Sequence, residues 1–234
     1  MKRLSFLLLL FSALFFFFFI GLVFLKQTFG PFPLMSFQDA LDVLTPLVLL
    51  PLYYVLLWKS TAGPPGTKTM GAFMFFAALW AAGQGMHLAA NSISNLLVKL
   101  GMDLGDIFNL TYFYDEILGH YLWHIGVVGL SAALIWQQLK ELPELENVPR
   151  WPSVAGGVIY GFSYFLIIME GNTAPVGVTF SVLAVLFILI RARKALRRPV
   201  ILFSLSGYSL AMILFLVWGI INGGLPPILD VIKV

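Results

Sequence analysis

The sequence predicts an all-α protein, a polytopic membrane bundle of about seven helices. Hydrophobic residues make up 60% of its 234 residues, charged residues only 11%, and the mean hydropathy is +0.94. Soluble domains are about one-quarter charged. Long apolar runs recur along the chain, and about 20 apolar residues suffice to cross the hydrocarbon core as a helix. We expect one integral-membrane domain over 1–234 with short loops.

Apolar runs place the spans at 5–25, 38–58, 69–97, 111–137, 151–170, 174–191 and 199–222. The first run follows Lys2 and Arg3, as the core of a signal peptide would, but it exceeds 20 residues. Signal cores have about 7–15 residues, and no pair of small residues suited to cleavage follows this one. We therefore expect a retained first helix, with its Phe15–Phe19 run facing lipid.

Basic residues gather in alternate loops of this arrangement. Of the 14 lysines and arginines, 11 lie before the first span or in the loops after spans two, four and six; the others are Lys26, Lys99 and Lys233. Cytoplasmic loops carry the excess positive charge in membrane proteins. We expect the N-terminus in the cytoplasm and the C-terminus outside. The pI near 9.2 reflects these border positions, so no nucleic-acid partner is expected.

All three histidines fall inside predicted spans. His87 lies in the third, His120 and His124 lie in the fourth, and Glu116 precedes His120 by one helical turn. The four-residue spacing puts Glu116, His120 and His124 on roughly one helix face. Ionisable residues are costly in hydrocarbon and by default mark functional sites. The alternative is polar packing between helices.

The predicted topology brings these residues to one depth. The third span runs outward with His87 in its second half, and the fourth runs inward with Glu116–His124 in its first half. The fifth span ends at Glu170 on the same side, where Asp39 and Asp42 begin the second. Reversing either histidine helix would separate the histidines into opposite leaflets. We therefore expect a polar layer in the outer leaflet.

A polar stripe surrounds His87 on the third span. Gln84, His87, Asn91 and Asn95 follow helical spacing. Small residues flank the stripe and permit close helix approach: Ala81, Ala82, Gly83, Gly85, Ala89 and Ala90. We expect Gln84 and Asn91 to support a histidine ring through its free nitrogen. Alternatively, these amides only join helices by hydrogen bonds.

Three imidazoles and a carboxylate suit zinc with a water in an open position. His87, His120 and His124 would be ligands, and Glu116 or Asp115 a fourth ligand or the general base. On an ideal helix Asp115 points about 100° away from Glu116, so the two do not easily share one role. A zinc-bound water in the outer leaflet would hydrolyse a lipid amide or ester. The same ligands accept copper or iron. The absence of cysteine excludes thiolate ligands.

The seven spans and intramembrane histidines resemble the ceramidase and adiponectin-receptor superfamily of intramembrane zinc hydrolases. That family has Ser-x-x-x-His early, an acidic residue on the next helix and His-x-x-x-His on the last. Here Gly83 takes the place of the serine before His87, and Asp115 or Glu116 matches the acid. The His120–His124 pair lies on the fourth span instead of the last. The resemblance implies zinc-dependent lipid hydrolysis.

Two other chemistries are alternatives. LWAAGQGMHLAAN resembles the histidine helix of the emopamil-binding (sterol isomerase) family, and GGVIYGFSYFLIIMEGNTAPVG resembles a later segment of that family. This resemblance implies a metal-free isomerase of a sterol-like lipid. Asn91 replaces the family's glutamate, so Glu116 or Glu170 would supply the carboxylate.

The other alternative is a b-type haem held by two histidines in a redox protein. The expected partner is a membrane lipid or lipid-like small molecule; a non-catalytic membrane subunit or a transporter is a further alternative.

Overall fold

The chain forms a bundle of long helices in a computed structural model that describes residues 2–30, 32–61, 63–140 and 148–231. Seven helical segments of this part are long and apolar enough to cross a membrane. They are Arg3–Phe24, Phe37–Lys59, Thr67–Lys99, Asp106–Lys140, Trp151–Glu170, Ala174–Arg191 and Pro199–Asn222. The predicted fold class is confirmed, and the protein is a multi-pass integral membrane protein.

The first two spans are joined by a short antiparallel hairpin that the sequence analysis did not predict. The elements here are α1 (Lys2–Phe19), the 3-10 turn η1 (Gly21–Phe24), β1 (Thr28–Phe29), β2 (Phe32–Ser36), α2 (Phe37–Asp42) and α3 (Leu44–Lys59). Ser36 caps α2, because its hydroxyl accepts a hydrogen bond from the Asp39 amide at 3.1 Å and the Asp39 carboxylate accepts one from the Ser36 amide at 2.9 Å. This capping box fixes the start of α2, on which Asp42 approaches the histidine layer.

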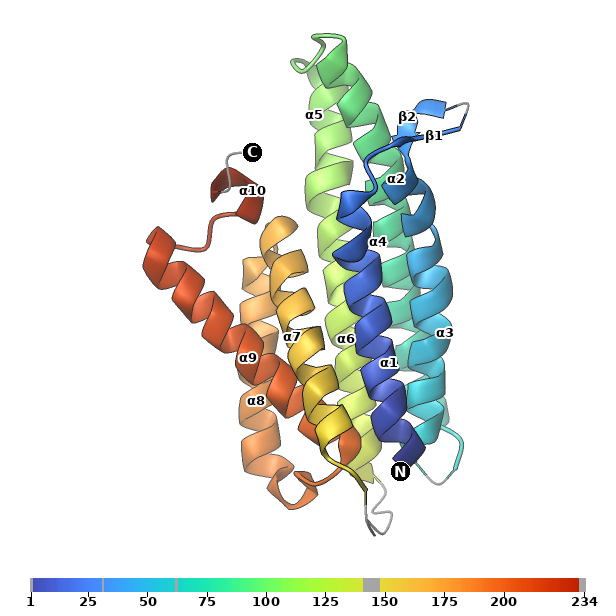
Figure 1. The fold of residues 1–234 in the computed structure, drawn as a ribbon, viewed down its shortest axis with the longest axis vertical. Helices are drawn as coiled ribbons and strands as arrows, with labels where there is room; N and C mark the ends of the chain where they lie inside the picture. Colours follow the sequence, from blue (N-terminus) through green and yellow to red (C-terminus); the bar gives the residue numbers. More distant parts are fainter. Residues whose placement is uncertain (1, 31, 62, 141–147, 232–234) are drawn as a thin grey trace.

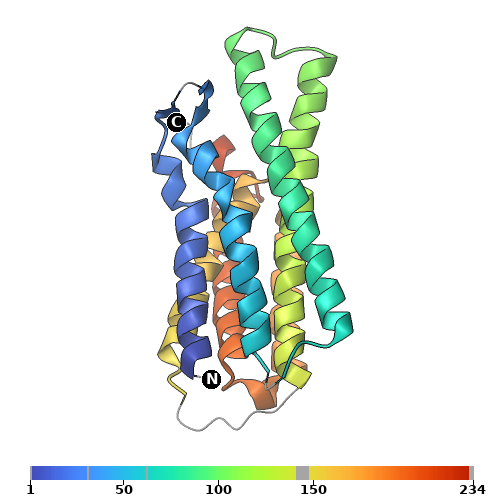
Figure 2. The same ribbon diagram turned by 90° about the vertical axis from the view of Figure 1, so that its right-hand side faces the viewer.

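The third and fourth spans extend beyond the predicted 69–97 and 111–137 at both ends. The third is α4 (Thr67–Lys99); the fourth joins α5 (Asp106–Tyr112), the π-helix η2 (Phe113–Gly119) and α6 (His120–Lys140). With 33 and 35 residues, each extends roughly 50 Å, against about 30 Å for a hydrocarbon core. Figure 2 shows the α4–α5 hairpin rising above the other helices. The predicted third span ends at 97 and the predicted fourth span begins at 111 because polar residues lie between these two apolar runs. A helix that leaves the membrane carries such residues at little cost.

The last three spans have the predicted bounds. They are α7 (Trp151–Glu170), α8 (Ala174–Arg191) and α9 (Pro199–Asn222), with the short helices η3 (Arg193–Ala195) and α10 (Ile228–Val231) after α8 and α9. α4 packs along α6 and α7 packs along α9, while α1 contacts α7 and α3, and α3 in turn contacts α4 and α6 (Figure 1). The histidine helices are therefore adjacent, and α1 and α7 border them.

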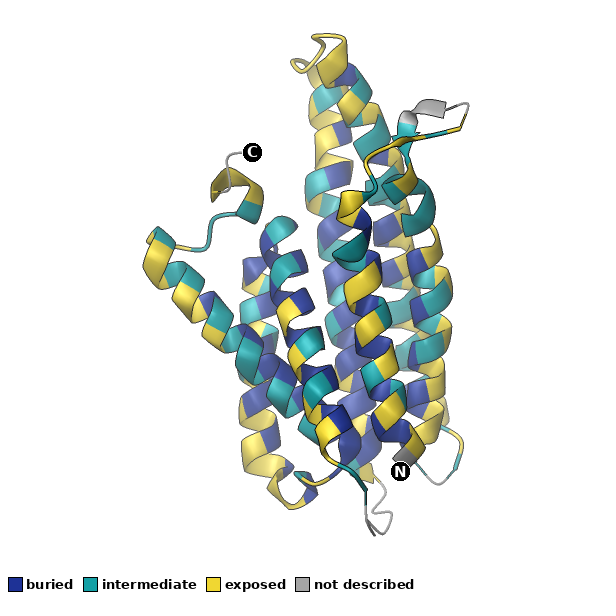
Figure 3. Ribbon diagram, viewed as in Figure 1, coloured by how far each residue is buried: buried dark blue, intermediate teal, exposed yellow. Residues whose placement is uncertain are grey.

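The Phe15–Phe19 run does not face lipid as a block, which corrects the prediction. Phe16 and Phe17 are 37% and 48% exposed, whereas Phe15 is fully buried and Phe18 is 9% exposed. A helix turns about 100° per residue, so five consecutive residues cannot all point outward. Exposed positions elsewhere follow the outer faces of the helices, where lipid would contact them (Figure 3).

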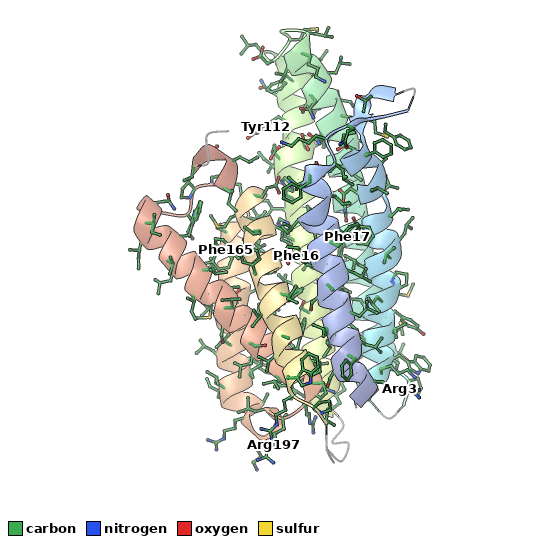
Figure 4. All side chains as sticks on the ribbon, viewed as in Figure 1. Arg3, Phe16, Phe17, Tyr112, Phe165 and Arg197 are labelled. Atoms are coloured by element: carbon green, nitrogen blue, oxygen red, sulfur yellow. The ribbon has the colours of Figure 1, made fainter. Side chains whose placement is uncertain are left out.

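The two ends of the bundle differ in charge. Figure 4 shows Arg3 and Arg197 at one end and Tyr112 towards the other. The N-terminus and the basic loops share the first end (Figure 1), as the sequence analysis expected. Lys233 lies outside the described residues. That the basic end faces the cytoplasm stays a prediction.

Cysteine labelling tests this orientation. The chain has no cysteine, so Lys99→Cys and Lys194→Cys would each carry the only thiol, at exposed positions near opposite ends. We expect an impermeant maleimide to label position 194 only from the cytoplasmic side and position 99 only from the other. Labelling of both from one side would contradict the topology.

Candidate functional site

Close packing of α4 on α6 and η2 brings the histidines together. A Cβ atom at Gly83 would lie 2.4 Å from the Trp123 amide nitrogen and 2.5 Å from the Gly119 carbonyl oxygen. Only glycine permits this backbone approach. His87 follows Gly83 by about one turn, so its ring reaches His120, and the two ring centroids lie 4.5 Å apart. The predicted layer thus contains these two side chains in contact.

The π-helix η2 turns Asp115 towards His87. The Asp115 Oδ1 atom lies 2.7 Å from His87 Nδ1, and Asp115 is 2% exposed. The two atoms are in close contact but do not meet hydrogen-bond geometry, and neither has another hydrogen-bond partner among the described residues. The wider i→i+5 turns of a π-helix change the direction of each side chain relative to an α-helix. Asp115 and Glu116 contact different histidines: Asp115 lies against His87, and Glu116 lies 3.7 Å from His120, as the four-residue spacing predicted.

His120 lies between two glutamates. Its Nδ1 atom is 3.2 Å from the Glu116 carbonyl oxygen and 3.7 Å from Glu116 Oε2. Its Nε2 atom is 3.8 Å from Glu170 Oε2, at the end of α7. His120 is fully buried, while the Glu116 and Glu170 side chains are 38% and 43% exposed. The ring thus connects two partly accessible carboxylates.

His124 is held by the turn between α7 and α8. Its Nδ1 atom lies 2.5 Å from the Thr173 hydroxyl, and its ring packs on Trp123 with centroids 4.6 Å apart. A Cβ atom at Gly171 would lie 2.6 Å from His124 Cε1, so the turn closes over the ring. Thr173 was not identified from the sequence, because nothing local marks a threonine beside a helix end as a histidine partner.

Gln84 and Asn91 do not support the histidines as predicted. Gln84 donates to Asp42 Oδ1 at 2.8 Å and accepts from the Trp80 indole at 2.6 Å. Asn91 accepts from Asn95 at 3.0 Å on an exposed face. Among the described residues, no hydrogen bond joins either amide to a histidine. Gln84 instead fixes Asp42, because α2 brings that carboxylate against α4.

A cavity of about 300 Å³ opens beside this cluster. Its polar wall includes Asp42, His87 and Glu170, from α2, α4 and α7. Its apolar wall is formed mainly by α1, η1 and α7, together with Trp123 of α6. Ligand pockets combine a largely apolar lining with a few convergent polar groups. Phe18 and Phe19 belong to this lining, a role that the sequence analysis missed.

The cavity lies near the edge of the hydrocarbon region. α7 has 20 residues and is therefore about 30 Å long, the thickness of the hydrocarbon core. Glu170 is its last residue, so the site is at the end of a full span, away from the basic end of the bundle. A lipid could place its polar head at the carboxylates while its chain stays in the membrane.

The side chains do not form a complete metal site as they stand. Across the described ranges, no group of three or more His, Asp or Glu side chains is arranged to hold a metal, although structural and catalytic zinc sites use three or four protein ligands. Two nitrogens nevertheless have the character of free ligands. His120 Nε2 and His124 Nε2 are buried and have no hydrogen-bond partner in the described part of the chain. Zinc, copper, iron and haem stay predictions.

Comparisons with known proteins give one weak similarity. The chain is 23% identical over 201 residues to ceroid-lipofuscinosis neuronal protein 6 from Homo sapiens, which covers 78% of this chain. The chain matches 62% of the length of that relative. No protein-family model matches the sequence. No solved structure matches it either.

Proposed function

We propose that the protein is an integral membrane enzyme that moves protons on a lipid, an acid–base isomerase. One observation carries this proposal: His87 lines a largely apolar cavity at the membrane edge, and the buried Asp115 carboxylate contacts its Nδ1 atom at 2.7 Å. A carboxylate behind an imidazole orients the ring and stabilises the charge it acquires on accepting a proton. Its other nitrogen, Nε2, is then available to the cavity.

An isomerisation needs a second group that gives a proton while the first removes one. Glu170 meets this requirement, because it lines the same cavity and its side chain is partly exposed. His87 would accept a proton from one carbon of the lipid and Glu170 would donate one to another. Such paired acid–base groups contribute about 10²–10⁴-fold each.

His120 would return a proton to Glu170, while His87, whose side chain is 17% exposed, would release the proton it accepted to water. His120 lies between Glu170 and Glu116, at 3.8 and 3.7 Å, so small side-chain movements would close hydrogen bonds on both sides. A proton could pass through the imidazole by exchange at its two nitrogens. Glu116 is partly exposed and would collect the replacement proton. This assigns a role to each titratable group around His120.

Isotope labelling tests the reaction type. Purified protein would be incubated with a panel of sterols, glycerolipids and amine-bearing lipids, once in D₂O and once in H₂¹⁸O. An isomerase places deuterium on a lipid carbon and leaves the lipid mass otherwise unchanged, with no ¹⁸O. Incorporation of ¹⁸O into a released carboxylic acid would instead show hydrolysis and contradict the isomerase proposal.

A metal-dependent lipid hydrolase is the second candidate. The unpartnered Nε2 atoms of His120 and His124 favour it, because imidazole nitrogens are common metal ligands. A bound metal would activate water for attack on an ester or amide. Elemental analysis of the purified protein, with an absorption spectrum for haem, tests this candidate. A stoichiometric metal that is lost in His120→Ala would support it, and a metal-free active protein would exclude it.

A further inference from the structure

We infer that the cavity binds the ammonium head of an amine-bearing lipid, with Asp42 and Glu170 as the anionic contacts. The inference takes from the proposed function only the cavity as the substrate site. An ammonium contact uses the ionised form of Glu170, whereas proton donation uses the protonated form, which the relay through His120 would supply after the head group has bound. It names the chemistry of the head group that the site would accept. The charge balance of the cavity wall, the free acceptor atoms and the aromatic lining carry it together.

The charge balance around the cavity is acidic. Asp42 and Glu170 line it, and Asp115 and Glu116 lie behind His87 and His120. None of the described residues that line the cavity is a lysine or an arginine. In the part of the chain that the structure describes, no lysine or arginine nitrogen lies within 4.0 Å of any of these carboxylates; their close basic neighbours are histidines. Phosphate heads are bound mainly by arginine and lysine, and the described lining offers an anionic lipid only Gln38, His87 and the Trp123 indole as donors.

Both lining carboxylates keep free acceptor atoms. The hydrogen bonds that Asp42 accepts from Gln84 and Thr45 end on Oδ1; over the described ranges Oδ2 accepts none. The described residues donate no hydrogen bond to the Glu170 carboxylate, and among them its only basic side-chain nitrogen within 4.0 Å is His120 Nε2, at 3.8 Å. His120 Nε2 is itself buried without a partner there and faces Glu170. An ammonium group offers three donors and no acceptor, which matches such a set of acceptors.

Aromatic rings complete the environment. Trp123 and Phe19 line the cavity, and their ring centroids lie 4.9 Å apart at an interplanar angle of 33°. Cations bind favourably over aromatic faces, best over tryptophan. The remaining wall is aliphatic except for Gln38, with Ile20, Val23, Leu166, Ile167 and Ile228. This wall suits an alkyl chain that continues into the membrane from the same head group.

Binding of three matched lipids tests the inference. Hexadecylamine, hexadecan-1-ol and hexadecyl phosphate share one chain and differ only in head charge. We expect the unmodified protein in nonionic detergent to bind the amine about tenfold more tightly than the alcohol, because a charge-assisted hydrogen bond adds this much. The phosphate should bind most weakly. Equal binding of all three, or tightest binding of the phosphate, would overturn the inference.

Variants locate the binding. Glu170→Gln should weaken the amine about tenfold and leave the alcohol unchanged, and Asp42→Asn should do the same. Glu170 is at a helix end with its side chain 43% exposed, so its variant should fold even if Asp42→Asn does not. Asp103→Asn, at an exposed loop position, is the control. Full amine preference in Glu170→Gln would contradict the inference.

This experiment separates the ligand from the reaction, because binding is measured without turnover. Selective amine binding with no lipid turnover would contradict the proposed catalysis and support the head-group assignment. Turnover of a neutral or anionic lipid, with no selective amine binding, would remove the head-group assignment and keep the catalysis.

Discussion

The substitution Gly83→Leu is expected to separate α4 from α6 and to abolish the site. A Cβ at Gly83 would already lie within 2.5 Å of two backbone atoms of the facing helix segment, and backbone cannot move aside as a flexible side chain can. Overpacking a tight contact costs about 1–3 kcal/mol or more. We expect a clear fall in the thermal unfolding midpoint in detergent and loss of lipid turnover.

Gly85 provides the matched control for this substitution. It lies on the same helix, and a Cβ there meets nothing within 4 Å. Gly85→Leu introduces the same side chain at an exposed position and should leave both stability and turnover near those of the unmodified protein. Equal behaviour of the two variants would show that the close α4–α6 contact does not position the histidines.

The substitution Asp115→Asn is expected to lower turnover by about 10²–10⁴-fold. The substitution keeps the size of the side chain but removes the negative charge 2.7 Å from His87 Nδ1. An amide cannot stabilise the protonated ring as a carboxylate does. Turnover would be measured with whichever lipid the labelling experiment identifies. The unfolding midpoint would be followed in parallel.

Asp103→Asn makes the same chemical change at an exposed loop position and should retain full turnover. Asp115→Glu restores the charge on a longer side chain and should recover part of the rate. If Asp115→Asn turns over lipid at the unmodified rate, the pair with His87 has no catalytic role, and Asp115 only stabilises helix packing.

The membrane class and the layer of histidines could be predicted from the sequence, because both depend on patterns that extend over the whole chain. Apolar runs set the spans, and alternating basic loops set the direction of each helix. Those directions were enough to place His87 at the depth of His120, which the structure confirms with a 4.5 Å ring separation. Small residues around His87 also indicated the close contact that Gly83 makes.

The side chains that contact the histidines could not be predicted in the same way. Asp115 reaches His87 because η2 is a π-helix, and a π-helix differs from an α-helix by a small local energy that tertiary contacts decide. Asp42 reaches Gln84 because α2 ends and α3 begins at Val43. Pro46 marks this break, since it has no N–H to bond the Asp42 carbonyl four residues earlier, but the proline does not indicate what the Asp42 side chain contacts. Side-chain directions that differ from those of an ideal α-helix could therefore be determined only from the structure.

The amides show a further limit of pattern reasoning. Gln84, Asn91 and Asn95 share one stripe by spacing, but Gln84 is buried against Asp42 and Asn91 bonds Asn95 on an exposed face. Spacing identifies which residues share a face and not what lies opposite. The stripe thus splits between a part that supports the cavity wall and a part on the protruding hairpin.

The most direct measurement compares lipid turnover by the unmodified protein, His87→Gln and Asp103→Asn in the same vesicles. Glutamine retains polarity at position 87 but cannot accept and release a proton, and the folded fraction of each protein would be matched before the assay. The account predicts one new lipid species, formed at equal rates by the unmodified protein and Asp103→Asn and absent with His87→Gln. Formation of that species by His87→Gln at the unmodified rate would contradict the assignment of His87 as the proton-transferring residue.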